Sequence, residues 1–174
     1  EHGYPPDWQS LVALGAGLTE LEGVYVDEGV ATTRDGARVR IRLSDLVPRA
    51  MPRKDPAEST PSCATCVALR VVPRGNGLFA SQKLRFTLAP GFEPHVFDVL
   101  SVGSVNSVLY SRGGRGDNAI VGMVFSGADV RLTCAADGSL IAQIHDTSGF
   151  LLLMVIPVGG RDEYTWARFE RRRD

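Results

Sequence analysis

Two cysteines separated by two residues are the most conspicuous candidates for chemistry in this chain. Cys63 and Cys66 have the spacing found in redox pairs, zinc knuckles and local disulfides. A redox pair stands at the start of a helix that lowers a thiol pKa, whereas Cys66 leads directly into an apolar run typical of a strand. Zinc would need two further ligands, and Cys134 with His95 or His145 does not form a second clustered pair. We therefore expect one structural disulfide, between Cys63 and Cys66 or from one of them to Cys134, and no metal.

Acid–base chemistry would have to use one of the three histidines. One is terminal and the others are His95 and His145, of which we expect His145 to end a strand and Asp146 to begin a turn. The chain has no Gly-x-Ser-x-Gly segment that would present a nucleophile and no acidic series with the spacing of a calcium loop. We therefore predict no catalytic residue and no cofactor. An enzyme that uses His145, or the pair of Cys63 and Cys66, remains an alternative.

Two polar segments are predicted to be surface loops. The segment 111–118 is rich in Gly but lacks the Lys-Ser/Thr pair and the following helix of a phosphate loop, so we expect a hairpin loop. The segment 48–62 holds four of the ten prolines together with several charged residues, which favours an extended, mobile loop. Because loops on a rigid scaffold carry much of the binding function of proteins, we expect partner-binding residues in both. These are Arg49, Arg53, Lys54, Arg112 and Arg115.

The elements that position these residues are predicted to be strands. From Leu21 onward, short apolar or alternating runs are separated by Gly, Asp, Asn and Ser, a pattern typical of antiparallel strands and hairpins. The runs cover residues 21–26, 38–43, 65–72, 83–88, 95–102, 107–110, 119–125, 130–134, 140–145, 150–156 and 163–171. Between two of them, Asp137-Gly138 is a strong hairpin signal because Gly accepts the positive φ of such turns. We predict an all-β fold, an antiparallel meander of about ten strands that forms a barrel or a sandwich.

Two of these runs predict burial. In 38–43 the alternation is strict, which places Val39, Ile41 and Leu43 on the core face and three arginines on the other face. The run 150–156 has no polar residue and ends before Pro157. It is therefore predicted to be one central strand that is covered on both faces.

Length and composition limit the architecture and the partners. The chain has 174 residues, of which 44% are hydrophobic and 22% charged, as expected for one globular domain. A net charge of −1 is too small to drive binding to nucleic acid, which we exclude as a partner, or to an anionic membrane by itself. Residues 1–20 are predicted to be an N-terminal tether or arm, a short helical or coil segment that includes Pro5 and Pro6. Residues 21–174 are predicted to form a single β domain with the loop at 48–62.

Four segments together resemble a group of uncharacterised proteobacterial lipoproteins. They are 21–29, which is similar to an early DLSGxYxNxGE segment, the DGSL hairpin at 137–140, the apolar strand ending at Pro157, and 166–169, which is similar to a late WYRF segment. The resemblance implies a signal peptide and a lipid-bearing cysteine before Glu1. It thus implies a periplasmic protein anchored to the inner leaflet of the outer membrane, in an oxidising compartment. It implies no activity.

A second resemblance is to lipocalin-like barrels, in which an early G-x-W strand is held by an Arg of the last strand. Here Gly23-Val24-Tyr25 and Arg168 are similar to these elements. The resemblance implies a barrel with room for one small hydrophobic ligand. The residues that would line its cavity are Val24, Val39, Ile41, Leu84 and Phe86.

These observations favour a non-enzymatic module of the cell envelope that binds another protein. An inhibitor or immunity protein of a periplasm-acting effector is one form of this function. The alternatives are a lipocalin-like carrier of a small hydrophobic ligand and the enzyme described above. We expect contact with the membrane only through the N-terminal lipid anchor.

Overall fold

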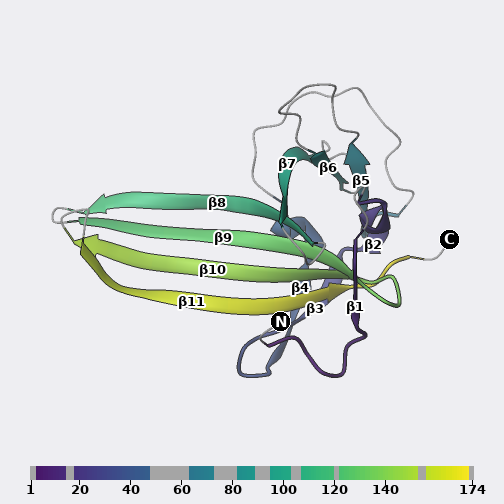
Figure 1. Cartoon of the computed structure of the whole chain (residues 1–174), viewed down its shortest axis with the longest axis horizontal. Helices are drawn as coiled ribbons and strands as arrows, with labels where there is room; N and C mark the ends of the chain where they lie inside the picture. The colour runs from purple at the N-terminus through teal and green to yellow at the C-terminus, as the bar shows by residue number, and fades with distance from the viewer. Residues whose placement is uncertain are drawn as a thin grey trace.

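The computed structural model (Figure 1) describes residues 3–14, 18–47, 63–72, 82–88, 95–102, 107–119, 122–152 and 156–172. Its strands are β1 (Leu11–Val12), β2 (Gly23–Val26), β3 (Glu28–Thr32), β4 (Arg38–Arg42), β5 (Cys66–Val72), β6 (Gln82–Thr87), β7 (His95–Val102), β8 (Ser107–Ala119), β9 (Gly122–Ala135), β10 (Leu140–Leu152) and β11 (Ile156–Phe169). Two short 3-10 helices, η1 (Thr19–Leu21) and η2 (Leu43–Leu46), complete the described elements. The described part of the chain contains no helix that is long and apolar enough to cross a membrane. The predicted all-β class is confirmed.

The strands are hydrogen-bonded in the order β2-β5-β6-β7-β8-β9-β10-β11-β3-β4, all antiparallel, and β1 adds to β9. The segment that follows β11 returns to β2, because the N–H of Val26 donates to the carbonyl of Glu170 and the N–H of Arg172 donates to that of Val24. These bonds surround a single isolated bridge and do not form a ladder. The sheet therefore curls around a core, and a closed barrel is not established.

The core lies at the base of the molecule, where the short strands meet the ends of β9, β10 and β11. Tyr25, Phe86 and Phe169 are its largest side chains, and each has an exposed fraction of 0%. A second, smaller cluster lies beneath the N-terminal arm, where Trp166 and its neighbours contact Tyr4. The described part of the arm is thus packed onto the domain.

Four long strands extend away from this base. Strands β8, β9, β10 and β11 have 13, 14, 13 and 14 residues, which corresponds to roughly 45 Å each. Figure 1 shows them projecting together far beyond the other elements. The other strands pair with them only near the base, where β1 joins β9, β3 joins β11 and β7 joins β8.

Three expectations about these long strands are wrong. The run 150–156 is not one strand, because β10 ends at Leu152 and β11 begins at Ile156. The run 119–125 is similarly divided between β8 and β9, and the segment 111–118 is not a hairpin loop but part of β8. A continuous apolar run carries no period that marks where a strand ends, and glycines do not prevent ladder pairing. A register shift between Ser111 and Gly114 marks the bulge that accommodates part of this Gly-rich segment.

The alternation in 38–43 is also only partly confirmed. Leu43 is fully buried in η2 and Ile41 packs against the core, but Val39 has an exposed fraction of 48%. Strand β4 is the last in the strand order and pairs with β3. Its first residues therefore extend past the core, so that alternation there does not produce burial.

Candidate functional site

A half-open groove lies between the N-terminal arm and strand β3. Its volume is about 250 Å³. The arm, β2, β3, β4 and the end of β11 all contribute to its lining, which consists of Asp7, Trp8, Val26, Glu28, Gly29, Val30, Arg38, Arg168 and Glu170. The groove thus combines residues from both ends of the chain.

Gly29 allows β3 to lie close to β11 at the floor of this groove. A Cβ atom at this position would lie 2.4 Å from the carbonyl oxygen of Arg168 and 2.4 Å from the ring of Phe169. Such distances are far below van der Waals contact, so a larger residue would separate the two strands. The position of the floor relative to the core therefore depends on this glycine.

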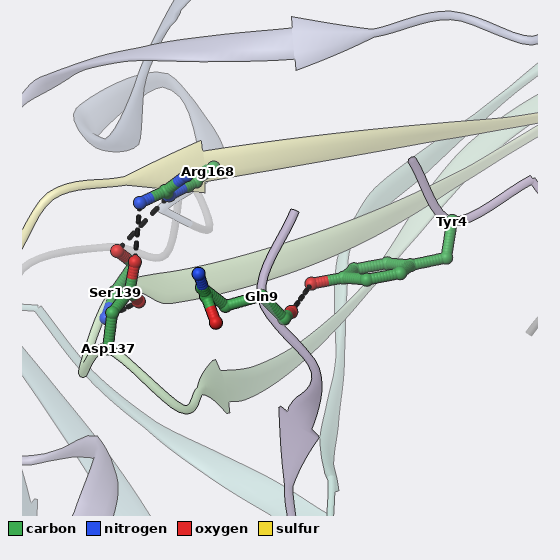
Figure 2. A network of polar contacts seen from close by, with 5 residues as sticks. All are labelled: Tyr4, Gln9, Asp137, Ser139 and Arg168. Atoms are coloured by element: carbon green, nitrogen blue, oxygen red, sulfur yellow. Dashed lines mark hydrogen bonds and ion pairs between the residues drawn. The ribbon is translucent and has the colours of Figure 1, made fainter. Parts of the chain in front are cut away.

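Arg168 is held in place by the turn between β9 and β10 (Figure 2). Its Nη2 lies 2.5 Å from Oδ2 of Asp137, and its Nε donates to the hydroxyl oxygen of Ser139 at 3.2 Å. Burial acts to raise the pKa of the Asp137 carboxyl, but hydrogen bonds from Ser139 and the charge of Arg168 outweigh it, and the pKa is lowered. The guanidinium of Arg168 is therefore a fixed, charge-paired part of the groove at neutral pH.

The N-terminal arm forms the opposite wall. The carboxylate of Asp7 makes an ion pair with Arg38 of β4. Tyr4 lies edge-on to Trp8, with ring centroids 5.9 Å apart, and its hydroxyl donates to the carbonyl of Gln9 at 2.5 Å, as Figure 2 shows. The arm is thus fixed by contacts on both sides of Trp8, which places an indole ring at the groove.

The groove combines apolar and charged groups. Val30 has an exposed fraction of 43% and offers apolar contact beside Trp8. Glu28 makes an ion pair with Arg40 at 3.2 Å, whereas Glu170 is exposed at the same groove. An aromatic ring next to a carboxylate is the combination that binds cationic side chains. Among the described residues, no group of three His, Cys, Asp or Glu side chains could hold a metal ion.

The cysteines follow one of the two predicted pairings. Cys63 and Cys66 form a disulfide with a Cα–Cα distance of 5.3 Å, and β5 begins at Cys66, so the pair precedes a strand as expected. Cys134 is free and buried, and its thiol donates to the carbonyl of Glu20 at 3.3 Å. Burial raises the pKa of Cys134 to about 11, so the thiol is protonated at neutral pH and is a poor nucleophile.

The expectation that His145 ends a strand and Asp146 begins a turn is wrong, because both lie within β10 and pair with β9 and β11. His145 is engaged by two residues of β11. Its ring stacks on that of Tyr164, with centroids 4.3 Å apart and an interplanar angle of 2°, and its Nε2 contacts the carboxylate of Asp162. The hydroxyl of Thr147, two residues along β10, donates to the carbonyl of Gly127. These contacts form a cross-strand cluster on β9, β10 and β11.

The other predicted site residues are dispersed. Arg49, Arg53 and Lys54 lie outside the described residues, and Arg112 and Arg115 lie on β8, far from the groove in the register. Of the five residues proposed to line a ligand cavity, Leu84 and Phe86 are fully buried in the core, Ile41 packs against it, Val24 is half-buried on β2, and Val39 is exposed. None of these five cavity candidates is among the described residues that line the groove.

Sequence reasoning missed the residues that do line it. The sequence indicates only an arm for Trp8 and Asp7, and it singles out Arg168 only through the lipocalin resemblance. The one local signal was a tryptophan in a polar, proline-containing segment. No protein-family model, curated protein or solved structure matches the chain. The function is therefore inferred from the residues of the chain.

Proposed function

We propose that this chain is a non-enzymatic protein-binding module of the cell envelope, held in the periplasm by an N-terminal lipid anchor, and that its partner docks at the groove. The observation that carries the binding role is the groove itself, whose lining includes the half-buried Trp8 and the exposed Val30 and Glu170. The location rests on the resemblance to envelope lipoproteins and on the disulfide, which persists in an oxidising compartment.

The size and position of the groove favour a peptide segment as the bound group. A volume of about 250 Å³ is below the range of roughly 300–1,000 Å³ that is usual for small-molecule sites. It suits one or two side chains of a partner. Strand β4, which contributes Arg38 to the groove, is the last in the described strand order, so an extended segment can pair with its edge.

The charges of the groove indicate the kind of side chain that enters. Arg38 and Arg168 are each paired with a carboxylate of this chain. Of the three exposed carboxylates in the lining, Asp7 and Glu28 make ion pairs with arginines of this chain, and Glu170 is the third. We therefore expect the partner to place a Lys or Arg side chain between Glu170 and the ring of Trp8.

Site-specific photo-crosslinking in the cell that produces the protein tests this function. A photoreactive residue at Val30 faces the groove, whereas the same residue at Val39 is a matched control. The two positions are exposed to 43% and 48% and lie on adjacent strands, but their register places them on opposite faces. We expect a defined protein adduct from position 30 and not from position 39.

Two substitutions then link the adduct to the groove. Trp8→Ala and Glu170→Gln should each weaken binding of the purified partner about tenfold or more, as expected for central interface residues. Equal adducts from both positions, or an adduct that survives both substitutions, would contradict the proposal.

A further inference from the structure

The far end of the four long strands brings two apolar stretches together. Neither 118–127 nor 147–160 contains a charged residue. The register places Val124 opposite Phe150, Met123 opposite Leu151 and Gly122 opposite Leu152. On the other side of β10, Leu151 pairs with Pro157 and Leu152 with Ile156. The last three register rows of β9 and β10 thus consist of apolar residues and one glycine, far from the core.

These apolar residues do not alternate with polar ones. Successive positions of a strand belong to opposite faces, so the consecutive apolar residues Met123, Val124 and Phe125 occupy positions on both faces of the sheet. The same holds for 150–152 on β10. At this end the described strands that pair with β9 and β10, besides each other, are β8 and β11, since β1 joins β9 only at the base, and Figure 1 shows the sheet projecting freely. A partner protein that docks on a surface covers one face, whereas lipid hydrocarbon can surround both faces.

A row with two arginines borders this apolar end. The register joins Arg115 to Ser126, Ser126 to Ser148, and Ser148 to Arg161, so both arginines occupy the same row, one on each outer strand. Four residues of β8, Gly116 to Ala119, lie beyond this row. They extend about 14 Å, which is close to the roughly 15 Å of one hydrocarbon leaflet. The two guanidinium-bearing positions thus match the depth of the lipid phosphates, with which they are complementary in charge.

We infer that the far end of the β8–β11 sheet inserts into one leaflet of a lipid bilayer, with Arg115 and Arg161 at the level of the phosphates. A strand needs roughly 9–11 residues to cross the hydrocarbon, so the four rows reach into one leaflet only. Asp117 is the one charged residue within them, and it lies on the outer strand two positions from Arg115. The inference does not depend on the groove or on a lipid anchor.

Flotation of the purified, unacylated chain with phosphatidylcholine vesicles, with and without phosphatidylglycerol, tests this inference. We expect the chain to float with both and more strongly with the anionic lipid. The double variant Met123→Ser with Leu151→Ser should lower the partition coefficient about tenfold or more, because two apolar side chains are removed from the part inferred to insert into lipid. The control is Val12→Ser with Val39→Ser, which removes two exposed apolar side chains at the base and should float as the unaltered chain does.

The arginine row is tested by a second pair of substitutions. Arg115→Gln with Arg161→Gln should lose about tenfold in binding to anionic vesicles and little in binding to phosphatidylcholine. Asp117→Asn should strengthen binding to both. Far-UV circular dichroism of each variant shows whether the sheet is intact.

Two results would overturn the inference. One is a failed flotation result: either the unaltered chain does not float with either kind of vesicle, or the variant Met123→Ser with Leu151→Ser floats as well as the unaltered chain. The other is that the chain is a dimer that Met123→Ser with Leu151→Ser converts to a monomer without any flotation, since a second copy would then cover the apolar end. The crosslink from position 30 is independent of both results.

Discussion

The two ends of β9 and β10 differ in how their apolar residues are arranged. Near the base, Val130 and Leu132 are fully buried and alternate with Asp129 and Arg131, which are exposed. At the far end, apolar residues follow one another without alternation. Alternation is the pattern of a sheet that the chain itself covers on one face, as the core does at the base. The core of the chain explains the alternation at the base, and the absence of alternation at the far end is the basis for the inferred insertion into lipid.

The largest expected effect on stability comes from replacing a phenylalanine by alanine, and it should differ between the two ends. Phe169→Ala should lower the free energy of unfolding by about 3–5 kcal/mol, because it empties space in a core where Phe169 has an exposed fraction of 0%. Phe150→Ala, in a register row beyond the core, should change it by less than about 0.5 kcal/mol in the absence of lipid. Urea unfolding measures both. Equal losses would mean that this chain also packs the far end, and would remove the basis of the comparison.

A second effect concerns how closely the strands of the base approach each other. Gly29→Ala should cost about 2–3 kcal/mol of stability, because its Cβ would overlap backbone of β11. Gly36→Ala is the matched control, since Gly36 has a φ of +83° but nothing lies within 4 Å of an added Cβ. It should cost about 1 kcal/mol from backbone strain alone. If the two variants unfold at the same urea concentration, close packing of β3 on β11 does not limit stability.

Local patterns explain how much of this fold could be predicted. The run 95–102 coincides with β7 at both ends, because apolar alternation and flanking turn residues are local signals. The run 150–156 does not reveal where β10 ends and β11 begins, because a continuous apolar sequence is typical both of a buried strand and of the end of a hairpin. The groove could not be predicted at all, because Trp8 and Arg168 meet only through long-range pairing of β1 and β3 with the long strands.

Removal of the disulfide tests whether the stability of the base affects the inferred insertion of the far end into lipid. Replacing Cys63 and Cys66 by alanine should cost about 2 kcal/mol, the value that loop entropy gives for so short a loop. Reductant should lower the free energy of unfolding of the unaltered chain by the same amount and leave that of the variant unchanged. Flotation with vesicles should be equal for the two proteins. A loss of flotation in the variant would show that the two ends are coupled.

The smallest expected effect is a pH-dependent contribution of Asp137. Asp137→Asn removes its ion pair with Arg168 and should cost about 1 kcal/mol at neutral pH. Because the pKa of Asp137 is lowered in the folded protein, its contribution is fully present above its ordinary value of 3.8. This contribution is lost as the pH falls from 3.8 through the pKa of the folded protein. Below that pKa the carboxyl group is protonated in both the folded and the unfolded protein. Urea unfolding of the two proteins should therefore differ equally at pH 7 and pH 5 and converge below about pH 4. A difference that grows on acidification would have the wrong sign for a lowered pKa, and would mean that the charge of Asp137 does not fix Arg168 at the groove.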